Sequence, residues 1–493
     1  MTQRNLLQDP CWEAKDLGEA LPNSPHAVSV ALPRWQDVIA YEEKENNCMS
    51  SLKAIYPRFG LNPLVSEVAQ HALKINKEKE FNTAWPYPNH STVNKAKAYC
   101  SSISKNGSTK VIEVLGLQCL LANENSTPAA KSFWQHTGLG ASSREAAIAL
   151  NKEIAPSPKA GAIAKELITQ RLSEIYGCQD EFITLYPSGM AALTNALSAI
   201  SIIHPNRPTL QIGFPYVDVL KLPQVIFSGS KLVLNTNPNH IKRLIKEIKP
   251  SAIIVELPSN PMLQCVDIKT ISEIANERDI PLIADDTIGS PLNINALSYA
   301  DLVFSSLTKS FAGKGDILAG SLVVNPKSKW NQILKEKIQQ SAICELANAD
   351  AIALEEASQD VFTRIPLLNQ ACMTLKAKLQ EHPSVARVFH PEDCPNYQKL
   401  LKDRGGYGCL VSFELTGGIE ATKNFYNSLK VCKGPSLGTN FSLACPYVLL
   451  AHYEELDWAK SCGVPPHLIR VSVGLEKPQI LWERFEKALN NQT

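Results

Sequence analysis

The feature that most constrains the fold is a series of seven short apolar runs that alternate with segments of helical period from about Lys159 onward. Strands that are buried on both faces read as continuous apolar runs, and the helices between them cover the two faces of the sheet. The pattern therefore predicts an α/β domain with a mostly parallel, seven-stranded sheet. The runs are EFITLYPSG, TLQIGFP, KLVLNTN, SAIIVELPSNP, IPLIADDT, ADLVFSSLTKS and ILAGSLVVN.

The length of the chain predicts more than one domain. At 493 residues it exceeds the roughly 250 to 300 residues that one hydrophobic core supports. Residues 1–145 are punctuated by Pro and Asn, so we expect an irregular N-terminal extension with short helices such as 64–79, serving as an interface arm or covering the site entrance. Residues 146–345 hold the seven runs. Residues 346–493 combine helices with strands such as VARVFH and GCLVSFEL, which predicts a smaller α+β C-terminal domain.

Composition excludes several classes of partner. Lys plus Arg total 49 and Asp plus Glu total 48, so no positive field attracts nucleic acid or an anionic membrane. No apolar run reaches the roughly 20 residues that span a bilayer, and the first residues lack an apolar signal core, so we expect a cytoplasmic protein.

The 13 cysteines are odd in number and lack C-x-x-C spacing, and no His or Cys cluster has metal-ligand spacing. We therefore expect reduced cysteines, no metal, and small molecules or further copies of the chain as partners.

In open parallel sheets, ligands bind beyond the carboxyl ends of the strands, so the residues that follow each apolar run are informative. Ser188, Gly189 and Met190 follow the first run and open the helical segment AALTNALSAI. The unpaired N–H groups of such a helix terminus can bind a phosphate, although an ordinary helix cap gives the same pattern.

Two further strand ends supply an anion and an amine. The run IPLIA ends in Asp285, and the run ADLVF is followed by Lys309 with the hydroxyl residues Ser306 and Thr308 before it. Taken singly, the carboxylate could be a turn residue and the lysine a solvated side chain. Together with the helix terminus they meet the three needs of pyridoxal 5'-phosphate (PLP): donors for the phosphate, an amine for the aldehyde and an anion for the pyridine nitrogen. The sequence therefore predicts PLP held as a Schiff base on Lys309.

The ordered motifs SGMAAL, VELPSNP, ADDT, SSLTKSFAGKGD and IRVSVGLE resemble the Cys/Met-metabolism family of PLP enzymes, which have the fold type I (aminotransferase-like) architecture. The stretches PHAVSVALPRWQDVIAYEE, YPRF, WQHTGLGASSRE, FPYVDVLK and LACPYVLLAHYEELDWA resemble more narrowly the long cystathionine γ-synthases of fungi. The resemblance implies an enzyme of transsulfuration and methionine biosynthesis.

The resemblance also implies roles for individual residues. Lys309 and Tyr216 would be catalytic, Arg470 would bind the substrate α-carboxylate, and Ser436 would lie beside Arg470. The cofactor would be bound by Ser188, Gly189, Met190, Tyr216, Asn260, Asp285, Ser306, Thr308, Lys309 and Arg144.

The predicted role of Arg144 as a phosphate ligand rests on a sequence that departs from the family pattern. Shorter members carry a Tyr-x-Arg element that reaches the phosphate in the neighbouring subunit, and the nearest match here is Ser142-Ser143-Arg144, without the tyrosine. If Arg144 does reach across, the active unit is a homodimer, or a homotetramer built as a dimer of dimers.

The reaction implied by the resemblance is γ-replacement on an O-acylhomoserine by L-cysteine. An O-acylhomoserine sulfhydrylase, a cystathionine or methionine γ-lyase and a γ-substituting enzyme of specialised metabolism are the alternatives within the family. A regulator or an inactive subunit on the same fold is the alternative outside enzymes. The absence of a basic helix-turn-helix pattern argues against a regulator, and the presence of Lys309 and Asp285 argues against an inactive subunit.

Overall fold

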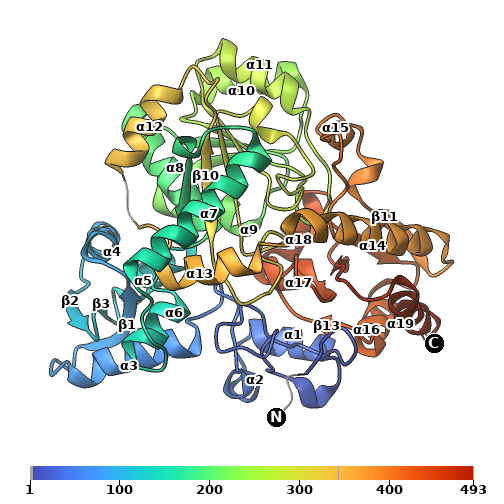
Figure 1. The fold of residues 1–493 in the computed structure, drawn as a ribbon, viewed down its shortest axis with the longest axis horizontal. Coiled ribbons are helices and arrows are strands. Elements are labelled where there is room, and N and C mark those ends of the chain that lie inside the picture. The colour runs from blue at the N-terminus through green and yellow to red at the C-terminus, as the bar shows by residue number, and fades with distance from the viewer. Residues whose placement is uncertain (1–3, 342–343, 492–493) are drawn as a thin grey trace.

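A computed structural model describes residues 4–341 and 344–491 of the chain. Its central element is a seven-stranded sheet with the order β4-β10-β9-β8-β7-β5-β6 (Figure 1). The strands from β5 to β9 pair in parallel, whereas β10 runs antiparallel to both of its neighbours. This confirms the predicted mostly parallel sheet. The strands are β4 (Ile183–Tyr186), β5 (Thr209–Ile212), β6 (Ser230–Val233), β7 (Ile253–Glu256), β8 (Leu282–Asp285), β9 (Leu302–Ser305) and β10 (Gly320–Val324).

Helices cover both faces of this sheet, which explains the continuous apolar runs. Ile253 of β7 and Leu282 of β8 face one core with α7, α10, α11 and α13, whereas the next residues, Ile254 and Ile283, face a second core with α8, α9 and α12. Successive side chains of a strand point to opposite faces, so every position of a central strand is buried. The helices are α7 (Pro158–Tyr176), α8 (Gly189–Ile203), α9 (Val217–Ile226), α10 (Pro238–Ile248), α11 (Ile268–Glu277), α12 (Asn331–Gln340) and α13 (Asn348–Ala357).

The C-terminal region forms its own sheet, with the order β11-β12-β15-β14-β13, in which only the β13–β14 pair is parallel. This confirms the smaller α+β domain. Its strands are β11 (Val385–Phe389), β12 (Leu410–Leu415), β13 (Cys432–Lys433), β14 (Leu443–Pro446) and β15 (Ile469–Ser472). Its helices are α14 (Val361–Glu381), α15 (Pro395–Gln398), α16 (Gly418–Ser428), α17 (Tyr447–Ala451), α18 (Leu456–Ser461) and α19 (Pro478–Asn490).

The N-terminal region is more regular than predicted. It contains a three-stranded antiparallel sheet with the order β1-β3-β2, in which β2 and β3 form a hairpin with positive φ at Leu115 and Gly116. The expected irregular extension is therefore wrong for this part of the chain. Its elements are α1 (Trp35–Glu42), α2 (Asn46–Ser51), α3 (Pro63–Ile75), β1 (Phe81–Tyr87), α4 (His90–Ile103), β2 (Thr109–Val114), β3 (Leu117–Asn123), α5 (Thr127–Thr137) and α6 (Ser143–Ala149). The exact domain boundaries at 145 and 345 stay a prediction.

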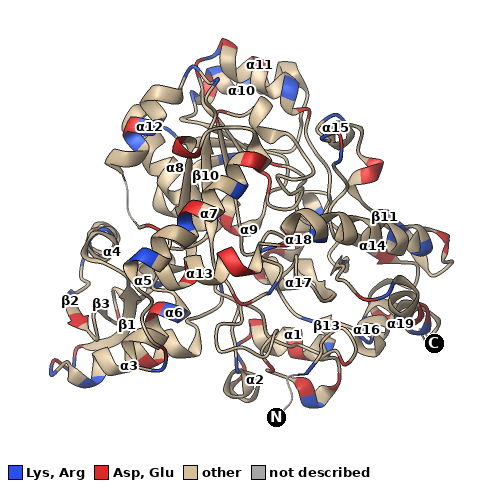
Figure 2. Ribbon diagram, in the orientation of Figure 1, with Lys and Arg blue, Asp and Glu red and all other residues tan. Residues whose placement is uncertain are grey.

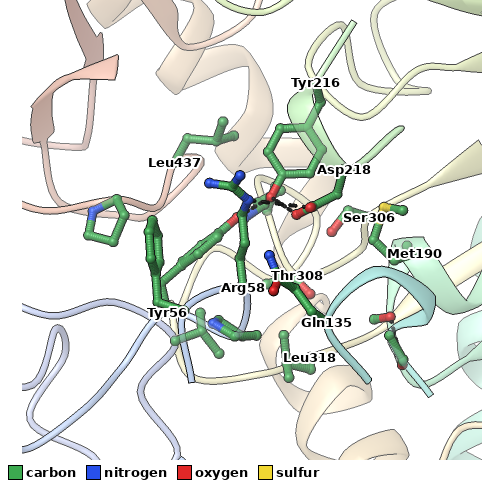
Figure 3. A pocket seen from close by; sticks show the side chains of 18 of the residues that line it. Tyr56, Arg58, Gln135, Met190, Tyr216, Asp218, Ser306, Thr308, Leu318 and Leu437 are labelled. Atoms are coloured by element: carbon green, nitrogen blue, oxygen red, sulfur yellow. Dashed lines mark hydrogen bonds and ion pairs between the residues drawn. The ribbon is translucent and has the colours of Figure 1, made fainter. Parts of the chain in front are cut away.

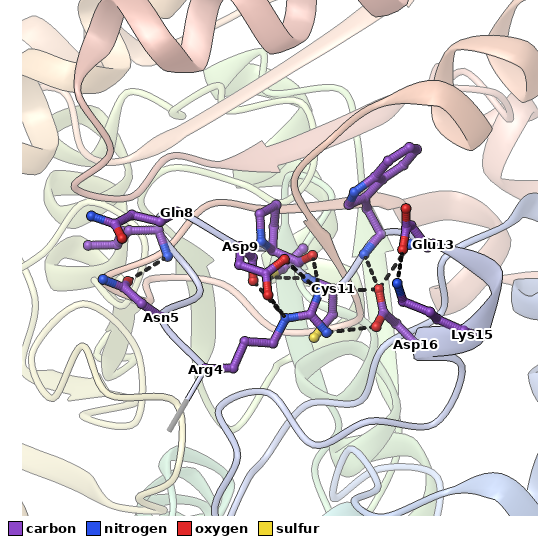
Figure 4. A network of polar contacts seen from close by, with 12 residues as sticks. Arg4, Asn5, Gln8, Asp9, Cys11, Glu13, Lys15 and Asp16 are labelled. Atoms are coloured by element: carbon purple, nitrogen blue, oxygen red, sulfur yellow. Dashed lines mark hydrogen bonds and ion pairs between the residues drawn. The ribbon is translucent and has the colours of Figure 1, made fainter. Parts of the chain in front are cut away.

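The first described residues are fixed by a polar network around Arg4 (Figure 4). Its guanidinium lies 2.7 Å from the buried Asp16 carboxylate and 2.9 Å from Asp9. Asp16 also accepts hydrogen bonds from the backbone N–H groups of Trp12 and Glu13. From there the chain continues to α1, which lies beside α16 and α17 of the C-terminal domain (Figure 1).

Short 3-10 turns complete the described elements. They are Ala14–Asp16, Asp180–Phe182, Ala296–Ser298, Pro391–Asp393 and Tyr453–Glu455. Acidic and basic residues are interspersed over the ribbon (Figure 2). Within the described ranges, none of the helices combines the length and apolar character that a membrane span requires.

Candidate active site

A cavity of about 200 Å³ opens where β7, β8 and β9 end. Its lining includes the carboxyl ends of the central strands, residues 55–62 of the N-terminal region, and residues of β14, α17 and β15 in the C-terminal domain. Residues 26–28, the start of α8 and residues between Trp134 and Ser143 also contribute. The cavity therefore lies at the edge of the parallel sheet at which α/β proteins bind their ligands. Figure 3 shows part of its lining.

The N-terminus of α8 forms one end of the cavity. Ser188 is the N-cap: its hydroxyl accepts a hydrogen bond from the backbone N–H of Ala191 at 3.0 Å and donates to the Gly138 carbonyl. The N–H groups of Gly189 and Met190 belong to the first turn of the helix, in which no intrahelical acceptor exists. A Cβ atom on Gly189 would lie 2.9 Å from the Cβ of Ser306, so only glycine fits here. This end can bind an anion such as a phosphate.

The two hydroxyl residues before Lys309 both line the cavity, but they differ in their partners. The Thr308 hydroxyl accepts a hydrogen bond from the backbone N–H of Ala319 at 3.0 Å and donates to the carbonyl of the same residue at 3.3 Å. For Ser306, the hydrogen bond is made by the backbone N–H, which donates to the Thr287 hydroxyl. Ser306 is therefore the better placed of the two to donate a hydroxyl proton to a ligand.

Asp285 ends β8 and is buried in the opposite part of the lining. One carboxylate oxygen accepts a hydrogen bond from the backbone N–H of Thr287 at 2.9 Å. Burial raises the pKa of Asp285 to about 6, opposed by the Thr287 hydrogen bonds, and no cation of the described chain acts on it. A buried carboxylate without a cation, facing an anion-binding helix terminus across one cavity, fits the pyridinium and phosphate ends of PLP.

Lys309 lies between these two ends. Its side chain is buried, and its Nζ donates to the Tyr56 hydroxyl at 3.2 Å and to the Ser436 hydroxyl at 3.5 Å. Burial acts to raise the pKa of Tyr56, but the Lys309 charge and the hydrogen bonds to Lys309 and Tyr216 outweigh it, so the pKa is lower than usual. The lysine thus has an amine inside the cavity and a phenol beside it that can exchange protons with it.

Tyr216 and Asn260 lie at the ends of two neighbouring strands and share one partner. The backbone N–H groups of both residues donate to the same carboxylate oxygen of Glu256, at 2.7 Å and 3.3 Å. Burial raises the pKa of Glu256 well above its usual value. Glu256 therefore ties together the two loops that carry the predicted cofactor residues.

Arg470, on β15, is a residue of the C-terminal domain that lines the cavity. Its guanidinium donates to the Asn260 side-chain oxygen at 3.2 Å and to the Ser436 carbonyl at 2.9 Å. It is almost fully buried over the Tyr447 ring, and its Nε has no hydrogen-bond partner within the described chain. A buried guanidinium with a free N–H group can bind the carboxylate of a ligand.

Arg144 does not line this cavity, although its neighbours Ser142 and Ser143 do. Its guanidinium donates to the Asp316 carbonyl at 2.9 Å and lies 3.3 Å from the Asp350 carboxylate, which holds it away from the anion-binding end. The sequence-based role of Arg144 at the phosphate therefore has no support from the geometry of this chain.

Two residues that the sequence reasoning did not identify line the cavity instead. Tyr56 and Arg58 lie in the segment that leads into α3, and Arg58 points toward Asp218 (Figure 3). The signal was present in the sequence, because YPRF contains the Tyr-x-Arg spacing that was sought at Arg144.

No metal centre lies in the part of the chain that the structure describes, since His, Cys, Asp and Glu side chains nowhere gather there in groups of three that could hold an ion.

Comparison with known proteins agrees with this geometry. The family model described as "Cys/Met metabolism PLP-dependent enzyme" matches residues 158–490. The chain is 28% identical to the cystathionine gamma-synthase of Neurospora crassa, covering 96% of this chain and 98% of that one. It is also 28% identical to the cystathionine gamma-synthase of Saccharomyces cerevisiae, covering 97% and 99%.

A solved structure shows the fold. The cystathionine gamma synthase of Xanthomonas oryzae pv. oryzae in complex with cystathionine superposes with a TM-score of 0.60 at 23% identity, covering 69% of this chain and 89% of that one. The chain thus has the predicted fold type I architecture. It belongs to the Cys/Met-metabolism family of PLP-dependent enzymes, and its cofactor is PLP.

Proposed function

We propose that the protein catalyses γ-replacement: the thiol of L-cysteine displaces the acyloxy group from Cγ of an O-acylhomoserine, giving cystathionine and a carboxylic acid. The observation that carries the proposal is the meeting of Lys309, Asp285, Tyr216 and Arg470 in one cavity. The similarity to two fungal cystathionine gamma-synthases over nearly the whole chain supports the choice of this reaction within the family.

Arg470 would bind the α-carboxylate of the amino-acid substrate, with the Asn260 side chain and the Ser436 carbonyl holding the guanidinium in place. This contact would direct the Cα and Cβ hydrogens of the substrate toward Lys309. A guanidinium binds a carboxylate through two parallel hydrogen bonds, so it fixes the orientation as well as the position of the substrate.

Bound PLP supplies an electron sink that allows the Cα and Cβ protons of the substrate to leave. The Nζ of Lys309 would take and return these protons, since it is the amine inside the cavity. The Tyr56 hydroxyl, 3.2 Å from this nitrogen, and the Tyr216 hydroxyl beside it would carry a proton to or from Nζ. The Asp285 carboxylate would stay ionised opposite the pyridine nitrogen.

The phosphate would be held by the N–H groups of Gly189 and Met190 at the start of α8, with Ser306 adding a hydroxyl. Ser188 would act as the helix cap, and Thr308 would hold the adjoining backbone. For the cationic ligand we assign Arg58 in place of Arg144, because Arg58 lines the cavity and follows a tyrosine with the family's Tyr-x-Arg spacing.

The test is a comparison of acceptors with pure protein and an O-acylhomoserine. We expect cystathionine as the main product with cysteine, and less product with sulfide or without a thiol. Release of 2-oxobutyrate as the dominant product even with cysteine present would refute the synthase assignment in favour of a γ-lyase. Faster turnover with sulfide than with cysteine would favour a sulfhydrylase.

The proposed covalent attachment of PLP to Lys309 is tested separately, with a control variant at a nearby lysine. Lys309→Ala should abolish turnover and leave no visible absorbance after dialysis, whereas Lys314→Ala, at an exposed lysine five positions later, should retain both. Hydride reduction of the wild-type protein should tag the peptide that contains Lys309.

The active form would be a homodimer or homotetramer in the cytoplasm. The exposed apolar side chains Ile163 and Leu167 on α7, and Phe362 and Leu367 on α14, offer surfaces that a second copy could cover. Light scattering of the PLP-loaded protein tests this, and a monomer with full activity would exclude it.

A further inference from the structure

Asp218 is a buried carboxylate in the first turn of α9 that contacts three side chains, of which Tyr216 and Arg58 line the cavity. One oxygen accepts a hydrogen bond from the Tyr216 hydroxyl at 3.0 Å. The other lies 3.3 Å from the Nε of Arg58 and 3.3 Å from the Nδ1 of His136. These partners come from three separate parts of the chain, namely the N-terminal segment, α5 and the loop before α9, and Figure 3 shows two of them, Arg58 and Tyr216, pointing toward Asp218.

Asp218 keeps its charge in this position. Burial acts to raise its pKa, but the Arg58 charge and the interactions with His136 and Tyr216 outweigh burial and hold the pKa below the usual range. An ionised carboxylate can only accept hydrogen bonds, so the Tyr216 proton is committed to Asp218.

The Tyr216–Asp218 hydrogen bond extends a series of polar contacts that begins at Lys309. The two phenol oxygens of Tyr56 and Tyr216 lie 3.4 Å apart, and either could donate if considered alone. Tyr216 donates to Asp218, and the Nζ of Lys309 donates to Tyr56. The four side chains therefore form one connected series of polar contacts, from Lys309 through Tyr56 and Tyr216 to Asp218.

Asp218 is also where the N-terminal segment is attached to the site. Arg58 reaches it from residues 55–62, and its second contact is a longer hydrogen bond of 3.5 Å to the Leu450 carbonyl of α17. A charge-assisted contact in a buried site is stronger than a long neutral one, so Asp218 is the main polar anchor of Arg58.

We propose that Asp218 is a positioning residue of this enzyme: it orients Tyr216 against the cofactor, anchors the Lys309–Tyr56–Tyr216 series of contacts and fixes the Tyr56–Arg58 segment in the cavity wall. The proposal rests on the proposed function for the identity of the site, but not on the choice of amino-acid substrate. It assigns Asp218 no contact with the reacting atoms.

The test compares Asp218→Asn with Asp350→Asn. Asp350 is an equally buried carboxylate that accepts from the Ser142 hydroxyl at 2.6 Å and lies 3.3 Å from Arg144, so it repeats the chemistry of Asp218, but Asp350 itself does not line the cavity and contacts neither Tyr216 nor Arg58. An asparagine amide can donate a hydrogen bond to the Tyr216 hydroxyl, and it carries no charge to attract Arg58. Asp218→Asn can therefore reverse the hydrogen bond with Tyr216, and it weakens the contact with Arg58.

Three measurements need no amino-acid substrate. In Asp218→Asn the dissociation constant for PLP should rise by roughly tenfold or more, the loss expected for a charged hydrogen bond. The circular dichroism of the bound cofactor's visible band should change, because it reports the stacking of Tyr216. Backbone hydrogen exchange should accelerate in residues 53–62. Asp350→Asn should leave all three as in the wild type.

A double-variant cycle separates positioning from general damage. If Asp218 acts through Tyr216 and Arg58, its replacement should change PLP affinity much less when Tyr216→Phe and Arg58→Gln are already present. Additive effects would overturn the proposal. Equal losses in Asp350→Asn, or wild-type PLP affinity, dichroism and exchange in Asp218→Asn, would overturn it as well. Because these measurements omit the amino-acid substrate, they stand even if the acceptor assay rejects cystathionine synthesis.

Discussion

The Asp285 carboxylate must be ionised to pair with the pyridine nitrogen, but its burial in the fold disfavours the ionised form. Its pKa is raised to about 6 by burial, so the folded chain binds the carboxyl proton more tightly than the unfolded chain does. Stability therefore falls as the pH rises from about 4 to about 6, and it stays lower above that range. The difference between about 6 and the ordinary 3.8 corresponds to about 3 kcal/mol in the protein without PLP.

Replacement of Asp285 by Asn should remove this cost. For the PLP-free protein at pH 8, the urea midpoint of Asp285→Asn is expected to exceed that of the wild type, and the two midpoints should converge near pH 4. Addition of PLP should stabilise the wild type more than the variant, because only the carboxylate offers a charge to the pyridinium. A lower midpoint for the PLP-free variant at pH 8 would contradict the assignment of Asp285 as an unpaired buried charge.

Arg470 supports a second prediction for a single residue. Arg470→Lys keeps the charge but loses the planar fork that can hold a carboxylate through two hydrogen bonds, so the KM for the amino-acid substrate should rise by about 10-fold to 100-fold. The dissociation constant for PLP should change little. Arg387→Lys, at a half-exposed ion pair with Glu414, is the control and should alter neither. A parallel loss of PLP affinity would place Arg470 at the cofactor instead of the substrate.

The start of α8 depends on close backbone packing against β10. A Cβ atom on Gly320 would lie 2.3 Å from the Ser188 carbonyl oxygen and 2.6 Å from the backbone nitrogen of Gly189. The first residue of β10 and the first turn of α8 thus approach each other more closely than a side chain allows. This contact fixes the direction of the N–H groups that face the cavity.

Gly320→Ala should therefore weaken both the fold and the cofactor site. We expect a loss of about 1–3 kcal/mol in stability, as for other overpacked positions, together with weaker PLP binding. Gly463→Ala is the matched control: φ is 84° and nothing lies near the added Cβ, so backbone strain should lower stability without changing PLP affinity. Unchanged PLP affinity in Gly320→Ala would show that the position of α8 does not matter for binding.

The order of strands and helices in the sequence was sufficient to predict which side chains meet at the sheet edge. Ser188, Asp285 and Lys309 each follow an apolar run, and carboxyl ends of parallel strands share one edge. The role of Arg470 could be predicted only from the family resemblance, since nothing local in IRVSVGLE indicates a ligand-binding residue. Arg58 carried a signal in the Tyr-x-Arg spacing of YPRF, but the role of Asp218 could not be predicted, because it depends on how a segment far away in the sequence packs against the site.

At the scale of the whole molecule, the sequence predicted the two larger sheets and missed the small one. Strand β2 is only half-buried and β1 contains Pro86, so neither shows the continuous apolar run of a central strand. The hairpin between β2 and β3 turns at Leu115-Gly116, without the Asn-Gly or Asp-Gly pair that marks most two-residue turns. Tertiary packing against α3 and α4 stabilises this sheet in place of local sequence signals.

The N-terminal segment and the C-terminal domain share one hydrophobic core, although they lie at opposite ends of the sequence. Trp35, Val38 and Tyr41 of α1 belong to the same buried cluster as Phe413 and Tyr426. The Trp35 and Tyr426 rings meet edge to face at 6.1 Å. Since residues 55–62 continue directly from this core to the cavity, the C-terminal domain supports part of the active-site wall indirectly.

We therefore expect Trp35→Ala to loosen the C-terminal domain as well as the segment that carries the substitution. Loss of a buried tryptophan costs about 3–5 kcal/mol, and backbone hydrogen exchange should accelerate in α16 and in residues 53–62. Phe133→Ala is a control of similar burial in a different core, and it should accelerate exchange in α4 and α8 while α16 keeps its protection. If α16 stays fully protected in Trp35→Ala, the N-terminal segment is an arm that folds independently of the C-terminal domain.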